Sequence, residues 1–203
     1  MIKFLPVQAI EEAAENFLQR YHSDKSLPIP IEEIIDLKLG LNIIPIPGLF
    51  DFHNIDAFLF SDRRGIIIDH DHLESRYSRA RYSLAHEVGH LVLHADYLDS
   101  LQINSLEIWK ESVLGKGIGN SMMETQANMF ASCLLMPLNH LKTEFEKVKA
   151  RLQADPFFNQ AEFLAEDVTL APFVAGTISR LFDVSEEAAL YRLINWIKGR
   201  PKS

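Results

Sequence analysis

Residues 83–94 read SLAHEVGHLVLH and place three histidines and one glutamate within an otherwise apolar run. The apolar residues recur at helical spacing, which predicts a long, buried helix over about residues 76–94. Burying imidazole and carboxylate groups costs free energy unless these groups have partners. The stretch therefore predicts a helix that carries a functional site as well as part of the core.

The centre of this stretch, residues 86–90, has the pattern HExxH. At about 100° per residue, His86 and His90 lie roughly 40° apart on one helix face, so both imidazoles can bind one ion. Glu87 lies beside them, placed to contact a water molecule at that ion, as in zinc-dependent proteases. The alternative is a helix with partly exposed histidines, but HExxH arises by chance in only about two of a hundred chains of this composition.

A catalytic zinc site needs a third protein ligand. His94 follows His86 by eight residues, about 80° of rotation and ~12 Å of rise, so an intact helix keeps it from the same ion. We expect His94 instead to interact with the helix macrodipole at the C-terminal end. Glu124 is the better candidate, because it stands at the start of an otherwise apolar helix, although a first-turn glutamate can also serve only as a dipole partner.

Two further residues of the second helix are assigned by their position. Asn128 lies one turn after Glu124 on the same face, where it is predicted to hold a ligating histidine in one orientation. Cys133 lies about 180° round the helix from Glu124 and is predicted to belong to the core.

The remaining pattern places strands early and helices late, which predicts an α+β fold with a small sheet in the N-terminal half. Apolar or β-branched runs separated by Gly, Pro, Asn and Asp predict three strands, the last two joined as a hairpin, within residues 41–47, 56–60 and 65–69. Helices are predicted over residues 7–20, from 31, over 76–94, 121–137 and 138–152, and as two or three short helices within 166–199, the last capped by Ser185. Residues 95–120 are predicted as a loop with some helix. We expect one domain over 1–150 and a helical segment over 151–203 packed on it.

Composition excludes several classes of protein. The 203 residues carry a net charge of −8 without a basic block, so no direct contact with nucleic acid is expected. No apolar run is long enough to span a membrane, and the N-terminus lacks the cleavage site of a signal peptide. The single cysteine, Cys133, excludes an internal disulfide and favours a reducing, cytoplasmic location.

The two motifs together resemble a known family. RARYSLAHEVGHLVLH at 79–94, followed after a spacer by ETQANMFASCLLMP at 124–137, is similar to the ImmA/IrrE family of bacterial metallopeptidases, and LFDVSEEAALYRL at 181–193 resembles that family's helical C-terminal segment more loosely. The resemblance implies a zincin-like, gluzincin-type core. Gln126 is a departure, because the family often has a second glutamate there, but it lies on another face from Glu124.

The resemblance implies roles for individual residues. His86, His90 and Glu124 are the implied zinc ligands, although Mn²⁺ or Fe²⁺ can occupy such a set, and Glu87 is the implied catalytic base. A second group that stabilises the oxyanion is usual, and the sequence leaves four candidates open: Tyr97, His140, His53 and Arg79. DHDH at 69–72 is interpreted as a solvated turn, with a second metal site as the alternative, and GIIID at 65–69 as an edge strand that could add a substrate strand.

The resemblance also implies a protein substrate. Family members typically act on helix-turn-helix (Xre-like) repressors, and some relatives are paired with such a partner as toxin and antitoxin, so we expect a partner in trans. One alternative is a zinc protein that binds its repressor without cutting it. Another is a DNA-binding regulator, because residues 177–196 scan as helix-turn-helix, but Glu186 and Glu187 at the start of the second helix would be repelled by phosphate.

Overall fold

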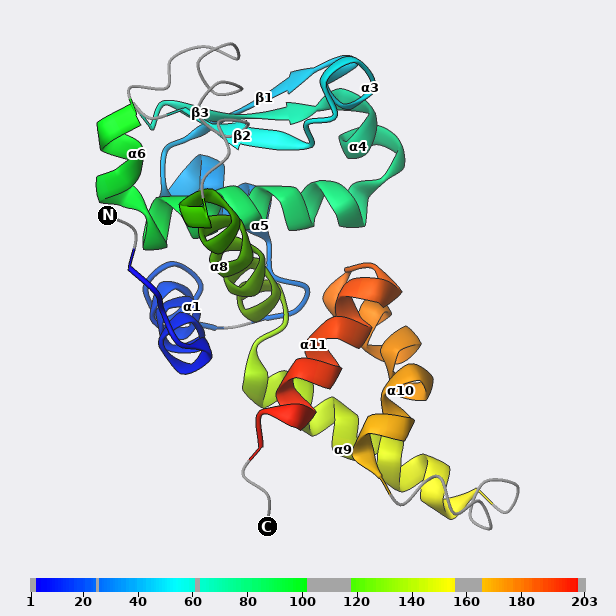
Figure 1. Cartoon of the computed structure of the whole chain (residues 1–203). Coiled ribbons are helices and arrows are strands. Elements are labelled where there is room, and N and C mark those ends of the chain that lie inside the picture. Colours follow the sequence, from blue (N-terminus) through cyan, green and yellow to red (C-terminus); the bar gives the residue numbers. More distant parts are fainter. Residues whose placement is uncertain (1–2, 25, 61–62, 102–117, 156–165, 201–203) are drawn as a thin grey trace. The chain divides into compact units, whose positions relative to one another are not determined.

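A computed structural model describes residues 3–24, 26–60, 63–101, 118–155 and 166–200 (Figure 1). The chain divides into two compact units, Met1–Leu135 and Met136–Ser203. The boundary lies earlier than the 150/151 division expected from the sequence. The helix over residues 138–154 therefore belongs to the second unit.

The first unit contains the sheet and the helices that surround it. Its elements, in chain order, are α1 (Val7–Tyr21), α2 (Ile31–Glu33), the π-helix η1 (Ile34–Lys38), β1 (Asn42–Ile46), α3 (Leu49–His53), β2 (Ala57–Leu59), β3 (Gly65–Asp69), α4 (His70–Ser75), α5 (Tyr77–Leu93), α6 (Ala95–Leu101) and α8 (Ile118–Leu135). Within the described residues, the small sheet precedes the long helices, so the α+β class is confirmed.

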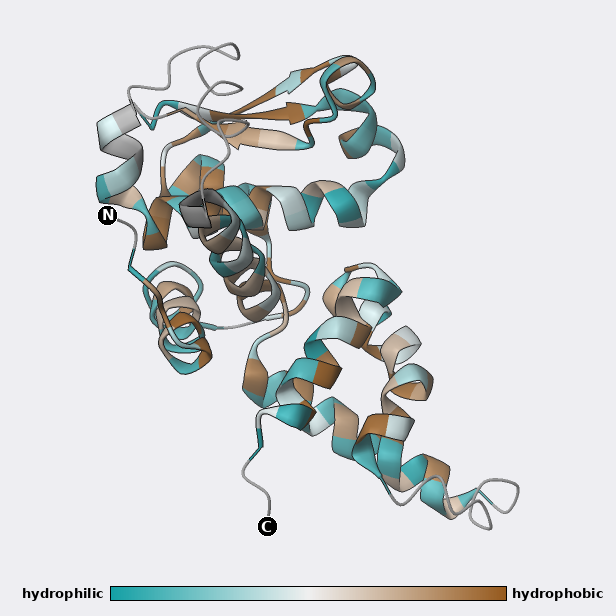
Figure 2. Ribbon diagram, viewed as in Figure 1, coloured by the Kyte–Doolittle hydropathy of each residue, from teal (hydrophilic) through white to brown (hydrophobic). Residues whose placement is uncertain are grey.

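The sheet has the order β1-β3-β2. β3 pairs in parallel with β1 and antiparallel with β2, with Phe58 opposite Ile67. All five residues of β3 are buried, because both faces of this strand are covered, which explains its continuous apolar run. Figure 2 shows β3 as the strongly hydrophobic strand of the sheet. The expectation that GIIID is an edge strand was wrong: β3 has a neighbour on each side, and within the described residues β1 and β2 form the edges.

Helix α5 lies at the centre of the first unit. It packs against β2 and β3 on one side and against α8 and α1 on the other (Figure 1). Ala80, Leu84, Ala85 and Val88 of α5 are fully buried in these contacts. A helix covered on both sides has little room for unpaired polar groups, so the histidines and glutamate of α5 face specific partners from the neighbouring elements.

The second unit is helical in its described part. It consists of α9 (Leu138–Ala154), α10 (Asp167–Phe182) and α11 (Glu186–Lys198), with α10 packed against both others. Ser185 caps α11 as expected, its hydroxyl oxygen accepting a hydrogen bond from the Ala188 N–H. Residues 156–165, where part of the expected tail lies, are outside the described residues, as are residues 102–117 of the expected loop.

Two short helices differ from the sequence prediction. α3 follows β1 and was not predicted. α4 occupies the stretch DHDH, which was interpreted as a solvated turn. Asp69 is the N-cap of α4: its Oδ1 accepts from the His72 N–H at 3.1 Å, and its Oδ2 accepts from the Phe50 N–H at 2.8 Å. Asp69 and His72 are both buried, whereas the His70 and Asp71 side chains between them are exposed, so only the two ends of this run contribute to the core.

Candidate metal centre

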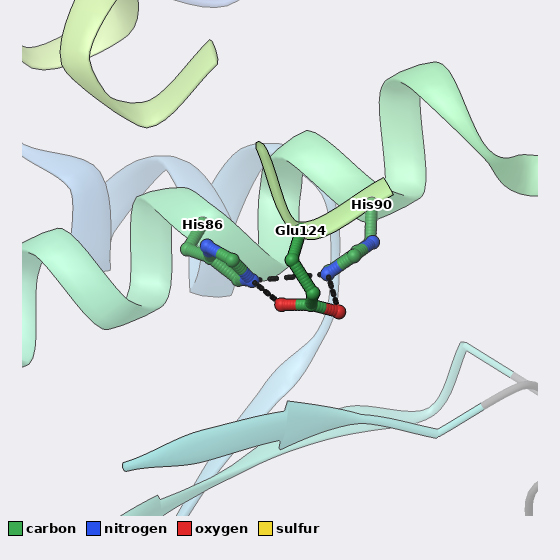
Figure 3. A group of neighbouring side chains, drawn as sticks. All are labelled: His86, His90 and Glu124. Carbon is green, nitrogen blue, oxygen red and sulfur yellow. Dashed lines mark hydrogen bonds and ion pairs between the residues drawn. The ribbon is translucent and has the colours of Figure 1, made fainter. Parts of the chain in front are cut away.

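His86, His90 and Glu124 converge on one point between α5 and α8, as Figure 3 shows. The Nε2 atoms of His86 and His90 lie 3.0 Å apart. Glu124 comes from α8 and places Oε2 3.1 Å from His86 Nε2 and Oε1 3.4 Å from His90 Nε2. The structure thus brings together the three residues that the sequence analysis selected, and Glu124 lies across from the histidine pair.

The close approach of α5 and α8 depends on the glycine inside the HExxH pattern. A Cβ atom at Gly89 would lie 3.1 Å from both Cα and O of Ala127, and 3.3 Å from Cβ of Phe130. Two of these atoms are backbone and cannot rotate away. Glu124 precedes Ala127 by three residues, nearly one turn, so the small residues Gly89 and Ala127 set the distance over which the Glu124 carboxylate reaches the histidines.

Charge is coupled across the cluster. Burial alone would raise the pKa of Glu124, but hydrogen bonds with His86 and His90 outweigh it and hold that pKa well below its usual value. Burial would likewise lower the pKa of His86, but the hydrogen bond to Glu124 and the negative charges of Glu87 and Glu124 raise it. In the metal-free protein, these residues therefore favour an ionised carboxylate beside a protonated imidazole.

The other ring nitrogen of His86 is also fixed from α8. His86 Nδ1 donates to Asn128 Oδ1 at 2.9 Å, the contact expected for Asn128. The backbone carbonyl of Asn128 in turn accepts from the Tyr82 hydroxyl at 2.9 Å. In its neutral form, with the proton on Nδ1, His86 presents the lone pair of Nε2 toward His90 and Glu124. Cys133, further along α8, is buried, as expected for a core residue.

The Glu87 side chain reaches the sheet. It is 7 % exposed, and its Oε2 accepts from the backbone N–H of Leu59 at 2.8 Å. Leu59 belongs to β2, an edge strand of the sheet. The edge strand therefore holds the Glu87 carboxylate, whose negative charge contributes to the raised pKa of His86. The contact joins sequence-distant residues and was not visible in the sequence.

His94 has a different role from the one expected. It is the C-cap of α5, as predicted, but it is only 5 % exposed and burial lowers its pKa, so it is not a charged partner of the helix dipole. Its Nδ1 lies 3.2 Å from His90 Nδ1, and its Nε2 lies 2.9 Å from Gln126 Oε1. Gln126 was assigned only to another face of α8, and its contact with His94 was missed.

The four candidates for oxyanion stabilisation lie in different surroundings. Arg79 donates from Nε to Asp56 Oδ1 at 2.6 Å, with a second bond to Oδ2, and stacks on the Phe50 ring. His53 is exposed at the end of α3, Tyr97 belongs to α6, and His140 belongs to the second unit. Within the described ranges, the only group of three or more His, Cys, Asp or Glu residues close enough to hold a metal is His86–His90–Glu124, so the DHDH alternative gains no support.

The donor set fits a divalent cation. A tetrahedral ion with bonds of about 2.0–2.1 Å keeps its ligand atoms about 3.4 Å apart. The two Nε2 atoms here are 3.0 Å apart, and each has a different oxygen of Glu124 at 3.1 or 3.4 Å. Two imidazoles and one carboxylate are also ligands that zinc commonly takes in catalytic sites. The residues present therefore suit one metal ion with room for a further ligand.

Comparison with known proteins agrees with this geometry. A family model of the M78 peptidases, described as the IrrE N-terminal-like domain, matches residues 38–194. The chain belongs to this family. The match confirms the resemblance to the ImmA/IrrE metallopeptidases, and it includes both motifs of the candidate centre. Membership in the M78 family supports peptidase activity and implies a divalent metal.

The curated proteins contain no match to this M78 chain. None of its described helices combines the length and the apolar character needed to cross a membrane.

Proposed function

We propose that this protein is a zinc-dependent endopeptidase that cleaves a helix-turn-helix repressor or antitoxin in trans and so regulates transcription. The observation that carries the proposal is the convergence of His86, His90 and Glu124 on one point, with Glu87 next to His86 in the chain and held by the Leu59 N–H. His86, His90 and Glu124 would hold the cation. When bound, it would polarise a peptide carbonyl and make a water molecule more acidic.

The chain's own residues supply the proton transfers. Glu87 takes a proton from the attacking water and passes it to the leaving amine nitrogen. A carboxylate has two oxygens, so Glu87 can accept from Leu59 N–H with one of them and carry the proton on the other. Asn128 keeps a proton on His86 Nδ1 and so directs Nε2 toward the metal position.

The substrate backbone is expected at the edge strand β2. Ala57 and Leu59 lie on the strand opposite Ile68 and Ile66 of β3. The Leu59 N–H is directed away from β3, because it donates to Glu87. The Leu59 N–H itself is taken by Glu87, so an extended peptide along this edge would pair with the neighbouring outward groups of β2 and pass beside the catalytic base. β2 therefore takes the role that the sequence analysis gave to GIIID.

The partner follows from the family resemblance and from the chain's charge. ImmA/IrrE relatives typically act on helix-turn-helix repressors, and the net charge of −8 does not favour binding to DNA itself. The lone cysteine is consistent with the reducing cytoplasm in which such repressors act. A regulator of this kind would reach DNA through its partner protein.

The test separates metal binding from chemistry with two variants. Glu87→Gln should bind zinc like the wild type but cleave about 10²–10⁴-fold more slowly, because the amide cannot take a proton. Glu124→Ala should lose zinc, because it removes a ligand. Helix-turn-helix repressors encoded in the same genome are tested as substrates, and intact-mass analysis with and without a chelator reports cleavage.

Each result has a definite meaning. Chelator-sensitive cleavage that Glu87→Gln abolishes supports the endopeptidase. A stable complex that forms without any cleaved product contradicts it and supports a regulator that binds without cutting. Full activity in Glu87→Gln excludes Glu87 as the base.

A further inference from the structure

A chain of hydrogen bonds leads from His90 away from the candidate metal centre. His90 Nδ1 lies 3.2 Å from His94 Nδ1, His94 Nε2 lies 2.9 Å from Gln126 Oε1, and Gln126 Nε2 donates to the backbone carbonyl of Lys3 at 3.2 Å. His90, His94 and Gln126 are all at least nine-tenths buried. The chain crosses from α5 to α8 and ends on the segment that precedes α1.

The outer end of this chain has only one possible polarity. A backbone carbonyl can only accept a hydrogen bond, so the group of Gln126 that faces Lys3 must be its amide nitrogen. The amide oxygen then faces His94, and His94 Nε2 must carry the proton that this oxygen accepts. The Lys3 carbonyl therefore determines which way the Gln126 amide points.

The polarity at the outer end of the hydrogen-bond chain determines which ring nitrogens of His94 and His90 carry protons. Metal ligation requires neutral imidazoles, and a neutral imidazole carries one proton. With that proton on Nε2, His94 Nδ1 is an acceptor, and His90 Nδ1 must donate to it. His90 Nε2 is then unprotonated and directs its lone pair to the point shared with His86 and Glu124 (Figure 3).

The opposite polarity would be incompatible with metal binding. If Gln126 presented its amide nitrogen to His94, His94 would carry its proton on Nδ1, and His90 Nδ1 would have to accept. His90 would then carry its own proton on Nε2, the atom that faces the metal position. The direction of the whole chain thus decides whether His90 can act as a ligand.

We propose that Gln126 and His94 are positioning residues, which set the tautomer of His90 and hold its Nε2 ready for the metal. The proposal rests on the proposed function only in taking His90 as a metal ligand. His86 is oriented separately, by Asn128. Two amide side chains of α8 thus orient the two histidines: Asn128 contacts His86 directly, and Gln126 acts on His90 through His94.

The direct test is to measure the tautomer of each histidine by long-range ¹H–¹⁵N NMR correlation of the imidazole rings. The measurement is made on the metal-free and on the zinc-loaded protein, above the pH at which the rings titrate. We expect His94 in the Nε2–H form in both, and His90 in the Nδ1–H form in the zinc-loaded protein. A predominant Nδ1–H form of His94 would overturn the proposal. Because the metal-free protein answers this question, failure of the peptidase assay does not affect it.

A variant series tests the consequence for metal affinity. Gln126→Glu keeps an acceptor for His94 and should bind zinc nearly as well as the wild type. Gln126→Met keeps the side-chain length but removes the acceptor, and zinc affinity should fall about 10–100-fold, the usual cost of losing an outer hydrogen-bond partner. Thr125→Met is the matched control, because Thr125 is exposed and its hydroxyl donates only along its own helix to Ser121 O.

The ranking of the two Gln126 variants by thermal stability should be the reverse of their ranking by zinc affinity. A buried carboxylate costs more than a buried thioether, so Gln126→Glu should unfold at a lower temperature than Gln126→Met and yet bind zinc more tightly. A merely structural role for Gln126 predicts the same order for both measurements, and that result, or wild-type zinc affinity in Gln126→Met, would overturn the proposal. If Gln126→Met does not fold, the histidine tautomers measured in the wild type still test the proposal.

Discussion

At the scale of single residues, His86 is held between two side chains of α8. Its Nδ1 donates to Asn128 Oδ1, and its Nε2 lies 3.1 Å from Glu124 Oε2. Burial alone would lower the pKa of His86, but its hydrogen bond to Glu124 and the nearby carboxylates raise it. A group whose pKa is higher in the folded state than in the unfolded state stabilises the fold in its protonated form. For His86, this contribution is complete below about pH 6.5 and is lost as the pH rises through the raised pKa.

Glu124→Gln should therefore lower the pKa of His86 in the metal-free protein. It should also reduce thermal stability more at mildly acidic than at alkaline pH. NMR titration of the His86 ring and thermal unfolding at several pH values measure the two effects. Glu74→Gln, at an exposed position of α4, is the control and should change neither. An unchanged His86 pKa in Glu124→Gln would show that the carboxylate does not govern this imidazole.

The residues of the centre differ in how far the sequence could predict them. His86 and His90 follow from the spacing on one helix, and Asn128 follows from its position one turn after Glu124. The bond between Glu87 and Leu59 and the one between His94 and Gln126 join residues 28 and 32 positions apart. Helical periodicity gives the face on which a side chain lies but not the element that covers that face, so these contacts required the structure.

At the scale of elements, local patterns again predicted the helices and strands, whereas their pairing depends on contacts between distant residues. The long helices were predicted because their apolar periodicity is strong, and β3 was predicted as a strand from its run GIIID. Its place in the centre of the sheet depends on pairing with β1 and β2, which no local pattern specifies. α4 was missed because its cap, Asp69, is also held by the distant Phe50 N–H.

The contact between α5 and α8 gives a prediction at this scale. Gly89→Ala places a methyl group 3.1 Å from the Ala127 backbone, so the helices must separate slightly. We expect a loss of about 1–3 kcal/mol in the free energy of unfolding, and weaker zinc binding because Glu124 moves with α8. Chemical denaturation and a zinc competition titration measure these effects.

Gly176→Ala in α10 is the matched control for this prediction. Its added Cβ would lie 3.1 Å from Oε1 of Glu186, the movable end of a flexible side chain. Alanine has the higher helix propensity, so this change should leave stability equal or increased and zinc affinity unchanged. Equal behaviour of the two variants would contradict the importance of close helix packing at Gly89.

At the scale of the whole molecule, the candidate centre and the C-terminal helices belong to different units. His86, His90 and Glu124 lie within Met1–Leu135, whereas α9, α10 and α11 form the second unit, Met136–Ser203. The family match covers parts of both units. All three metal ligands therefore come from the first unit, and a change confined to the second unit leaves the ligands themselves unaltered.

Asp167 is the residue with which to test this separation. It begins α10, accepts from Lys149 Nζ of α9 at 2.7 Å and pairs with Arg200, which follows α11 and stacks on Trp196. Burial would raise the pKa of Asp167, but the bonds from Lys149 and Arg200 lower it. A lowered pKa means that the carboxylate stabilises the fold above the unfolded value of about 3.9, and that this contribution is lost as the pH falls through the lowered pKa.

Asp167→Asn should therefore destabilise the second unit by about 1–2 kcal/mol at neutral pH, and the difference from the wild type should shrink in acid. The indole NMR signal of Trp196 reports unfolding of this unit, and Glu146→Gln, at an exposed position of α9, is the control. Zinc affinity should stay at the wild-type value, because all three ligands lie in the first unit. A fall in zinc affinity together with the loss of stability would show instead that the two units support the metal centre jointly.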